Sequence, residues 1–107
     1  MTATCRWTGV SGWPYDYEVV PFGTPLNSVA GNYALCRLGA DGYWYPLYFG
    51  EAEDLSKRCC AQHEKWAGAM RLGATHIHAK VTLGGKLVRC AEESDLRKAF
   101  NPPLNDQ

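Results

Sequence analysis

The segments Asn32–Leu38 (NYALCRL) and Tyr43–Phe49 (YWYPLYF), joined by residues 39–42 (GADG), decide the fold of this chain. Both segments are rich in aromatic and aliphatic side chains, which favour strands. The glycine-containing tetrapeptide between them is typical of a tight turn. The pattern therefore predicts a β-hairpin.

The predicted hairpin brings two tyrosines together. If its centre lies in the middle of the turn, Tyr33 and Tyr48 are directly opposite each other on one face of the ladder. A bulge at Pro46 would shift this register. A cross-strand aromatic pair that only packs is the simpler interpretation, and a shared chemical role is the other.

Three further elements are predicted downstream of the hairpin. Asp54 is a good N-cap for a helix from about 54 to 72, which Gly73 ends. Residues 75–82 (THIHAKVT) are typical of a strand, and a Gly-Gly turn follows them. A second helix is expected over residues 88–100 (VRCAEESDLRKAF), before two prolines that cannot continue it.

Upstream of the hairpin, residues 1–30 contain many glycine, proline, threonine and aromatic residues. They predict an irregular arm with one extended stretch at 17–22 (YEVVPF), suited to a sheet edge because of its proline. The fold class expected is α+β: a small, mostly antiparallel three-stranded sheet, open to a fourth N-terminal edge strand. Helices flank this sheet, and the element order is β-β-α-β-α.

Length and composition set outer limits. The chain has 107 residues and a mass of 11.9 kDa, which is enough for one domain. Hydrophobic residues make up 46% and charged residues 21%, which excludes disordered and collagen-like classes. No apolar run reaches the length of a membrane span, and the start MTATCRWTGV lacks the pattern of a signal peptide. We expect a cytoplasmic protein without a membrane partner.

Eleven basic and eleven acidic residues give zero net charge. This balance excludes a protein that holds nucleic acid by bulk positive charge alone. The charges are unevenly distributed, with two basic against six acidic residues in 1–54 and nine against five in 55–107. A polyanion can dock on the second half if the fold collects these cations on one side. A mixed, solvated surface is the alternative.

Five cysteines, at positions 5, 36, 59, 60 and 90, show no CxxC spacing. The odd number and the spacing argue against a zinc knuckle, and reduced thiols in a cytosolic compartment are expected.

Two tyrosine triplets and a spaced set of polar residues carry the strongest indication of function. The triplets are Gly31-Asn32-Tyr33 and Tyr48-Phe49-Gly50; Arg58, Glu93 and Asn105 follow in that order. Over residues 31–107 the chain resembles the GIY-YIG nuclease superfamily, a group of metal-dependent DNA-cutting domains. The resemblance implies an endonuclease with one divalent metal ion, Mg²⁺ or Mn²⁺, and DNA as its partner. An RNA-directed nuclease is a further alternative.

The resemblance also implies roles for individual residues. Tyr33 matches the tyrosine proposed as general base, which requires a cation to lower the pKa of its phenol. Tyr48 would orient the water or the phosphate. Arg58 would clamp the scissile phosphate with its forked donors.

At the C-terminal end, Glu93 would bind the metal, and Asn105 would support the site by hydrogen bonding. Glu92 is the alternative carboxylate. The twelve-residue step to Asn105 favours Glu93, and Asn101 is expected at the end of the helix.

Two positions depart from the family pattern. Asn32 replaces an aliphatic residue, and Gln62 stands where the family tends to have histidine or tyrosine. Gln62 cannot transfer a proton, so either His63 replaces it through a local helix distortion or activity is weakened. A module that keeps the fold and binds nucleic acid or protein without cleavage is therefore the alternative function. A nuclease of 107 residues has little surface left for reading bases, so we expect a homodimer or a second protein to supply specificity.

Other candidate sites are weaker. His76 and His78 share one strand face but lack a third metal ligand at a suitable distance, so solvent-facing or hydrogen-bonded histidines are the simpler interpretation.

Overall fold

A computed structural model describes residues 3–105. The chain enters through two strands, β1 (Ala3–Thr8) and β2 (Pro14–Pro21). The hairpin β3 (Gly31–Leu38) and β4 (Trp44–Ala52) follows, then α1 (Leu55–Arg58) and α2 (Trp66–Arg71). The chain continues with β5 (His76–Val81) and ends with α3 (Lys86–Phe100). The expected hairpin, the third strand and the last helix are all present within three residues of their expected bounds.

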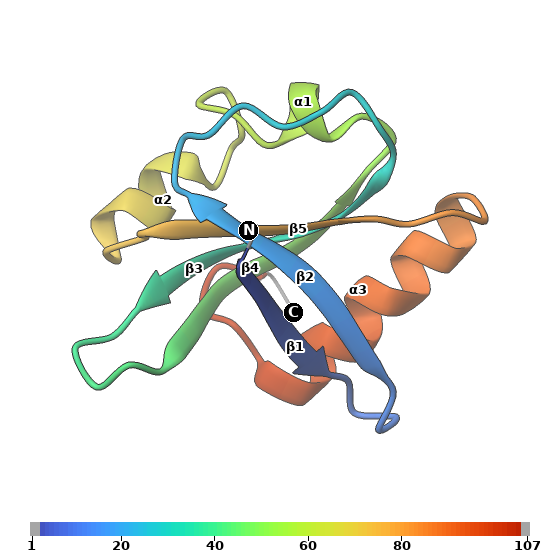
Figure 1. Ribbon diagram of the computed structural model, residues 1–107, viewed down its shortest axis with the longest axis horizontal. Coiled ribbons are helices and arrows are strands. Elements are labelled where there is room, and N and C mark those ends of the chain that lie inside the picture. The colour runs from blue at the N-terminus through green and yellow to red at the C-terminus, as the bar shows by residue number, and fades with distance from the viewer. Residues whose placement is uncertain (1–2, 106–107) are drawn as a thin grey trace.

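The five strands form one antiparallel sheet in the order β1-β2-β5-β3-β4. In Figure 1, α1 and α2 lie above this sheet and α3 lies below it. Two cores result. On the α1–α2 side, Tyr33, Leu35 and Ile77 pack with Leu55 and Cys59.

On the α3 side, Trp7, Tyr17, Ala34 and Phe49 pack with Leu96. Successive residues of β3 alternate between the two cores, as the pleat of a strand covered on both faces requires.

The expected three-stranded sheet and β-β-α-β-α order were wrong. The stretch expected to be an irregular arm is a β-hairpin, whose second strand pairs with β5 at Glu18↔Ala79. Its turn is held by Asp95 of α3, whose carboxylate accepts from the Ser11 backbone, the Ser11 hydroxyl and the Tyr15 hydroxyl. These contacts join residues 80 or 84 positions apart in sequence, which a local pattern does not reveal.

The single helix expected over 54–72 is also wrong. Asp54 does cap α1 by accepting from the backbone N–H of Ser56. The helix then stops after Arg58, and α2 begins only at Trp66. The turns between α1 and α2 place His63 against the sheet. The tertiary contact of His63 is therefore formed where the sequence pattern predicted continuous helix.

The register of the β3–β4 hairpin differs from the expected one. Leu47 is an extra residue, because Leu35 opposes Tyr48 while Cys36 opposes Pro46. Tyr33 consequently faces Gly50, and Tyr48 lies diagonally across the ladder on the same side of the sheet.

None of the helices in the described part of the chain is long and apolar enough to cross a bilayer.

Candidate active site

The two tyrosines form the floor of the candidate site. Their ring centroids are 6.1 Å apart and their planes are inclined by 36°. Tyr33 is fully buried, whereas Tyr48 is half-buried. The expected direct pairing is incorrect, but the diagonal pairing keeps both phenols on the α1–α2 face.

Close packing explains why both tyrosine triplets contain a glycine. A Cβ at Gly50 would overlap the phenol of Tyr33, and a Cβ at Gly31 would overlap the backbone carbonyl of Lys80. Neither glycine is among those with positive φ. Close approach is therefore what requires glycine at these positions.

His63 contacts both phenol rings, with centroid distances of 5.7 Å to Tyr33 and 5.2 Å to Tyr48. Its Nδ1 accepts the backbone N–H of Lys65 at 2.9 Å, and its Nε2 lies 2.5 Å from the Tyr33 hydroxyl. Burial lowers the pKa of His63 to about 4. The neutral ring therefore carries its proton on Nε2 and donates it to the Tyr33 oxygen.

The contact of His63 with the tyrosines concerns the departure from the family pattern at Gln62. Gln62 is exposed, and its amide oxygen accepts from the Cys60 thiol instead of facing the tyrosines. The interruption between α1 and α2 delivers His63 in its place. This interruption is the local helix distortion named in the first of the two alternatives for Gln62.

Arg58, the last residue of α1, supplies the positive charge of the site. Its Nη2 donates to Oε1 of Glu64 at 2.9 Å, and Glu64 is exposed. Burial raises the pKa of both tyrosines, and the positive charge of Arg58 counteracts this effect. For Tyr33 burial outweighs the cation, so the phenol is neutral in the free protein. The expected lowering of its pKa is not achieved.

Glu93 approaches from α3. Its half-buried carboxylate lies 3.7 Å from Nε of Arg97. Burial raises the pKa of Glu93, Arg97 and Arg58 oppose the rise, and Glu51 adds to it. The charge of Glu93 also raises the pKa of Tyr33 and Tyr48. Glu93 is thus within electrostatic reach of both phenols and the guanidinium.

The alternative carboxylate, Glu92, belongs to a different network. It is buried, accepts from the Tyr17 hydroxyl at 2.5 Å and pairs with Lys80 at 2.8 Å. Glu92 is therefore already paired with Tyr17 and Lys80 in the core between α3 and the N-terminal hairpin. Unlike Glu92, Glu93 is among the charges that raise the pKa of both Tyr33 and Tyr48.

Asn105 supports the site through the backbone. Its Oδ1 accepts from Phe49 N at 2.8 Å, and its Nδ2 donates to Phe49 O at 2.9 Å. The buried amide thereby satisfies the outer side of β4, an edge strand, next to Tyr48 and Gly50. Asn101 ends α3 in the left-handed conformation, as expected for a helix-end residue.

Asn32, the departure in the first triplet, faces away from the tyrosines. It is buried and donates from Nδ2 to the backbone oxygen of Arg89 at 2.9 Å. Arg89 in turn donates to Glu51 at 3.0 Å. The polar residue therefore ties β3 to α3 and has no place among the reacting groups.

Within residues 3–105, no group of three or more histidine, cysteine or carboxylate side chains could hold a metal ion. Mg²⁺ needs fewer protein ligands, since it keeps several waters and is bound by one or two carboxylates with substrate phosphates. Glu93 fits this mode, because a cation beside it would relieve both its burial and its repulsion from Glu51.

The pairing of Arg58 with Glu64 was missed in the sequence, whereas the interpretation of His76 and His78 as hydrogen-bonded histidines is confirmed. Glu64 pairs with Arg58, and its place directly after His63 was the available signal. The histidines of β5 form a separate cluster, in which Trp7 Nε1 donates to Nδ1 of buried His78 at 3.0 Å. Trp44 packs edge-on against His76 and His78, so both histidines contact aromatic rings.

Comparison of the chain with family models, curated proteins and solved structures gives no match.

Proposed function

We propose that this chain is a metal-dependent endonuclease that hydrolyses phosphodiester bonds in DNA. The observation that supports it is the cluster of Tyr33, Tyr48, Arg58 and His63 on one face of the sheet, with Glu93 in electrostatic reach. Hydrolysis of a phosphodiester needs a proton acceptor, a cation facing the phosphoryl oxygens, and metal assistance. The cluster contains a residue suited to each need.

In the proposed reaction, Arg58 exchanges its exposed partner Glu64 for oxygens of the scissile phosphate. Tyr33 is neutral in the free protein, so it first loses its own proton to solvent. The oxygen of the attacking water then bonds to phosphorus, the proton of this water passes to the Tyr33 phenolate, and the bond to the leaving sugar oxygen, which takes a proton from solvent, breaks. His63 Nε2–H stabilises the phenolate that accepts the proton, and Tyr48 orients the water or the phosphate. A divalent ion at Glu93 would supply Lewis-acid polarisation of the phosphate.

Nicking of supercoiled plasmid with Mg²⁺ or Mn²⁺ tests this proposal. Tyr33→Phe and Glu93→Gln should each lower the rate by about 10²- to 10⁴-fold. Tyr43→Phe and Glu53→Gln remove the same groups from exposed positions outside the cluster and serve as matched controls. Cleavage that persists unchanged in the site variants contradicts the assignment, and a parallel RNA substrate separates the two nucleic acids.

A binding module without cleavage is the second candidate function. Two observations favour it: Glu64 occupies the guanidinium of Arg58, and burial keeps the Tyr33 phenol neutral. An inert wild-type protein that binds duplex DNA with salt-dependent affinity would establish this alternative.

A cytoplasmic setting is part of the proposal. The five cysteines, all in the described part of the chain, are free, which agrees with a reducing compartment.

A further inference from the structure

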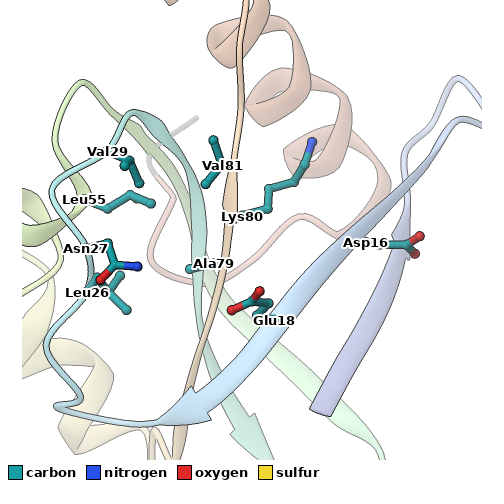
Figure 2. A pocket seen from close by; sticks show the side chains of 9 residues that line it. All are labelled: Asp16, Glu18, Leu26, Asn27, Val29, Leu55, Ala79, Lys80 and Val81. Carbon is teal, nitrogen blue, oxygen red and sulfur yellow. The ribbon is translucent and has the colours of Figure 1, made fainter. Parts of the chain in front are cut away.

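A groove lies on the α1–α2 side of the N-terminal half of the sheet, apart from the candidate active site. It encloses about 300 Å³ and is lined by β2, the β2–β3 loop, the start of α1 and the end of β5. Figure 2 shows Val29 and Val81 together toward one end and Glu18 toward the other. The floor between them includes Leu26 and Ala79.

Most charges of the groove are already compensated. Asp16 pairs with Arg6 at 2.7 Å, and Lys80 pairs with buried Glu92 at 2.8 Å. Among the described residues, Glu18 has no ion-pair partner, although it is exposed. The groove therefore combines an apolar floor with one uncompensated negative charge.

The chain leaves this groove at Val81 and forms an exposed tip, residues 83–87 (LGGKL), before and at the start of α3. Leu83 is 83% exposed and Leu87 is 86% exposed. Lys86 lies between them, is exposed, and has no ion-pair partner in residues 3–105. The tip does not fill the groove of its own chain, since its leucines remain in solvent.

We infer that the groove receives the tip of a second copy of this chain, forming a closed two-fold dimer. The tip carries two exposed leucines and a lysine, and the groove has an apolar floor and a carboxylate without an ion-pair partner. The two surfaces therefore complement each other in polarity and in charge. Groove and tip adjoin at Val81. One two-fold axis near Val81 then allows both copies to exchange tips, which closes the assembly. This inference does not depend on the nuclease proposal.

Sedimentation equilibrium of the full chain tests the inference. Wild type should approach twice the mass of the 11.9 kDa chain as concentration rises. Leu87→Glu should raise the dimer dissociation constant by about tenfold or more. This change leaves folding intact, because a negative charge at a helix N-terminus is favourable. Tyr43→Glu, at another exposed apolar position, should leave the dissociation constant unchanged.

Charge reversal identifies the pair that faces across the axis. Glu18→Lys and Lys86→Glu should each weaken the dimer, because every homodimer then contains two repulsive pairs. An equimolar mixture should recover the dimer, since both contacts of the heterodimer again join opposite charges. A wild type that stays monomeric at every concentration overturns the inference, as do unaltered variants, an unrecovered mixture or species larger than a dimer. Loss of duplex binding by Leu87→Glu without a change in mass also overturns it and assigns the tip to nucleic acid.

Discussion

The stability of the protein should fall between neutral pH and about pH 5, and His78 should account for much of the loss. His78 is fully buried, and Trp7 Nε1 donates to its Nδ1. Its Nε2 has no hydrogen-bond partner among the described residues. Burial, with a smaller contribution from His76, lowers its pKa from 6.5 to about 4.

The sign follows from proton binding. Below pH 6.5 the unfolded chain gains a proton at His78 that the folded protein takes up only near pH 4. The contribution to stability is therefore complete above pH 6.5 and is lost as the pH falls toward 4. Between pH 6.5 and about pH 5 the unfolded chain holds about one more proton at His78 than the folded protein. Over these roughly 1.5 pH units, each unit lowers the free energy of unfolding by about 1.4 kcal/mol. His78 alone should cost about 2 kcal/mol of unfolding free energy.

Urea unfolding followed by tryptophan fluorescence measures this loss at each pH. His78→Gln keeps an acceptor for Trp7 but does not titrate, so its unfolding free energy should fall by about 2 kcal/mol less than that of wild type between neutral pH and pH 5. The comparison uses the change with pH, so a general destabilisation of the variant does not affect it. Equal losses in the two proteins would refute the reasoning.

The remaining predictions concern the candidate site. Gly50→Ala should lower stability by about 1–3 kcal/mol and reduce nicking, because its methyl group displaces the Tyr33 phenol; urea unfolding and the plasmid assay measure both. Asn105→Ala should cost about 1–3 kcal/mol in the same unfolding experiment, since two hydrogen bonds to the Phe49 backbone are lost. The pKa of Tyr33 lies above its ordinary value, so kcat/KM should rise about tenfold per pH unit through the neutral range; a flat profile excludes Tyr33 as the base. Glu93→Gln should raise the melting temperature at neutral pH, because the buried carboxylate, whose pKa is raised, no longer has to be charged; an unchanged or lower value contradicts this.

Local sequence signals predicted the elements that local interactions determine. The β3–β4 hairpin has its glycine-containing turn, and Asp54 caps α1 with its own side chain. The register was wrong because one extra residue, Leu47, bulges from β4 beside a proline. A residue inserted at a bulge changes every pair beyond it, although each strand on its own still fits the pattern.

Long-range contacts determine the elements that the sequence did not predict. The rings of Trp7 and Tyr17 are buried between the sheet and α3, and Asp95 fixes the turn between β1 and β2. The break between α1 and α2 has the same kind of origin, because His63 gains the Tyr33 hydroxyl and the backbone of Lys65 as partners. The sequence analysis raised a local distortion that would bring His63 to the site, but no local pattern fixed where the helix breaks.

A comparison of the two buried histidines shows why we assign chemistry to one cluster and structure to the other. Burial lowers the pKa of both to about 4. The rings of Trp7 and Trp44 surround His78, and their packing offsets the free-energy cost of burying the imidazole. Around His63 lie the Tyr33 hydroxyl, whose oxygen accepts a hydrogen bond from Nε2, and Arg58, whose charge also lowers the pKa of His63. Packing alone does not call for a guanidinium beside a neutral histidine, whereas a site that must receive a phosphate in a poorly solvated setting does.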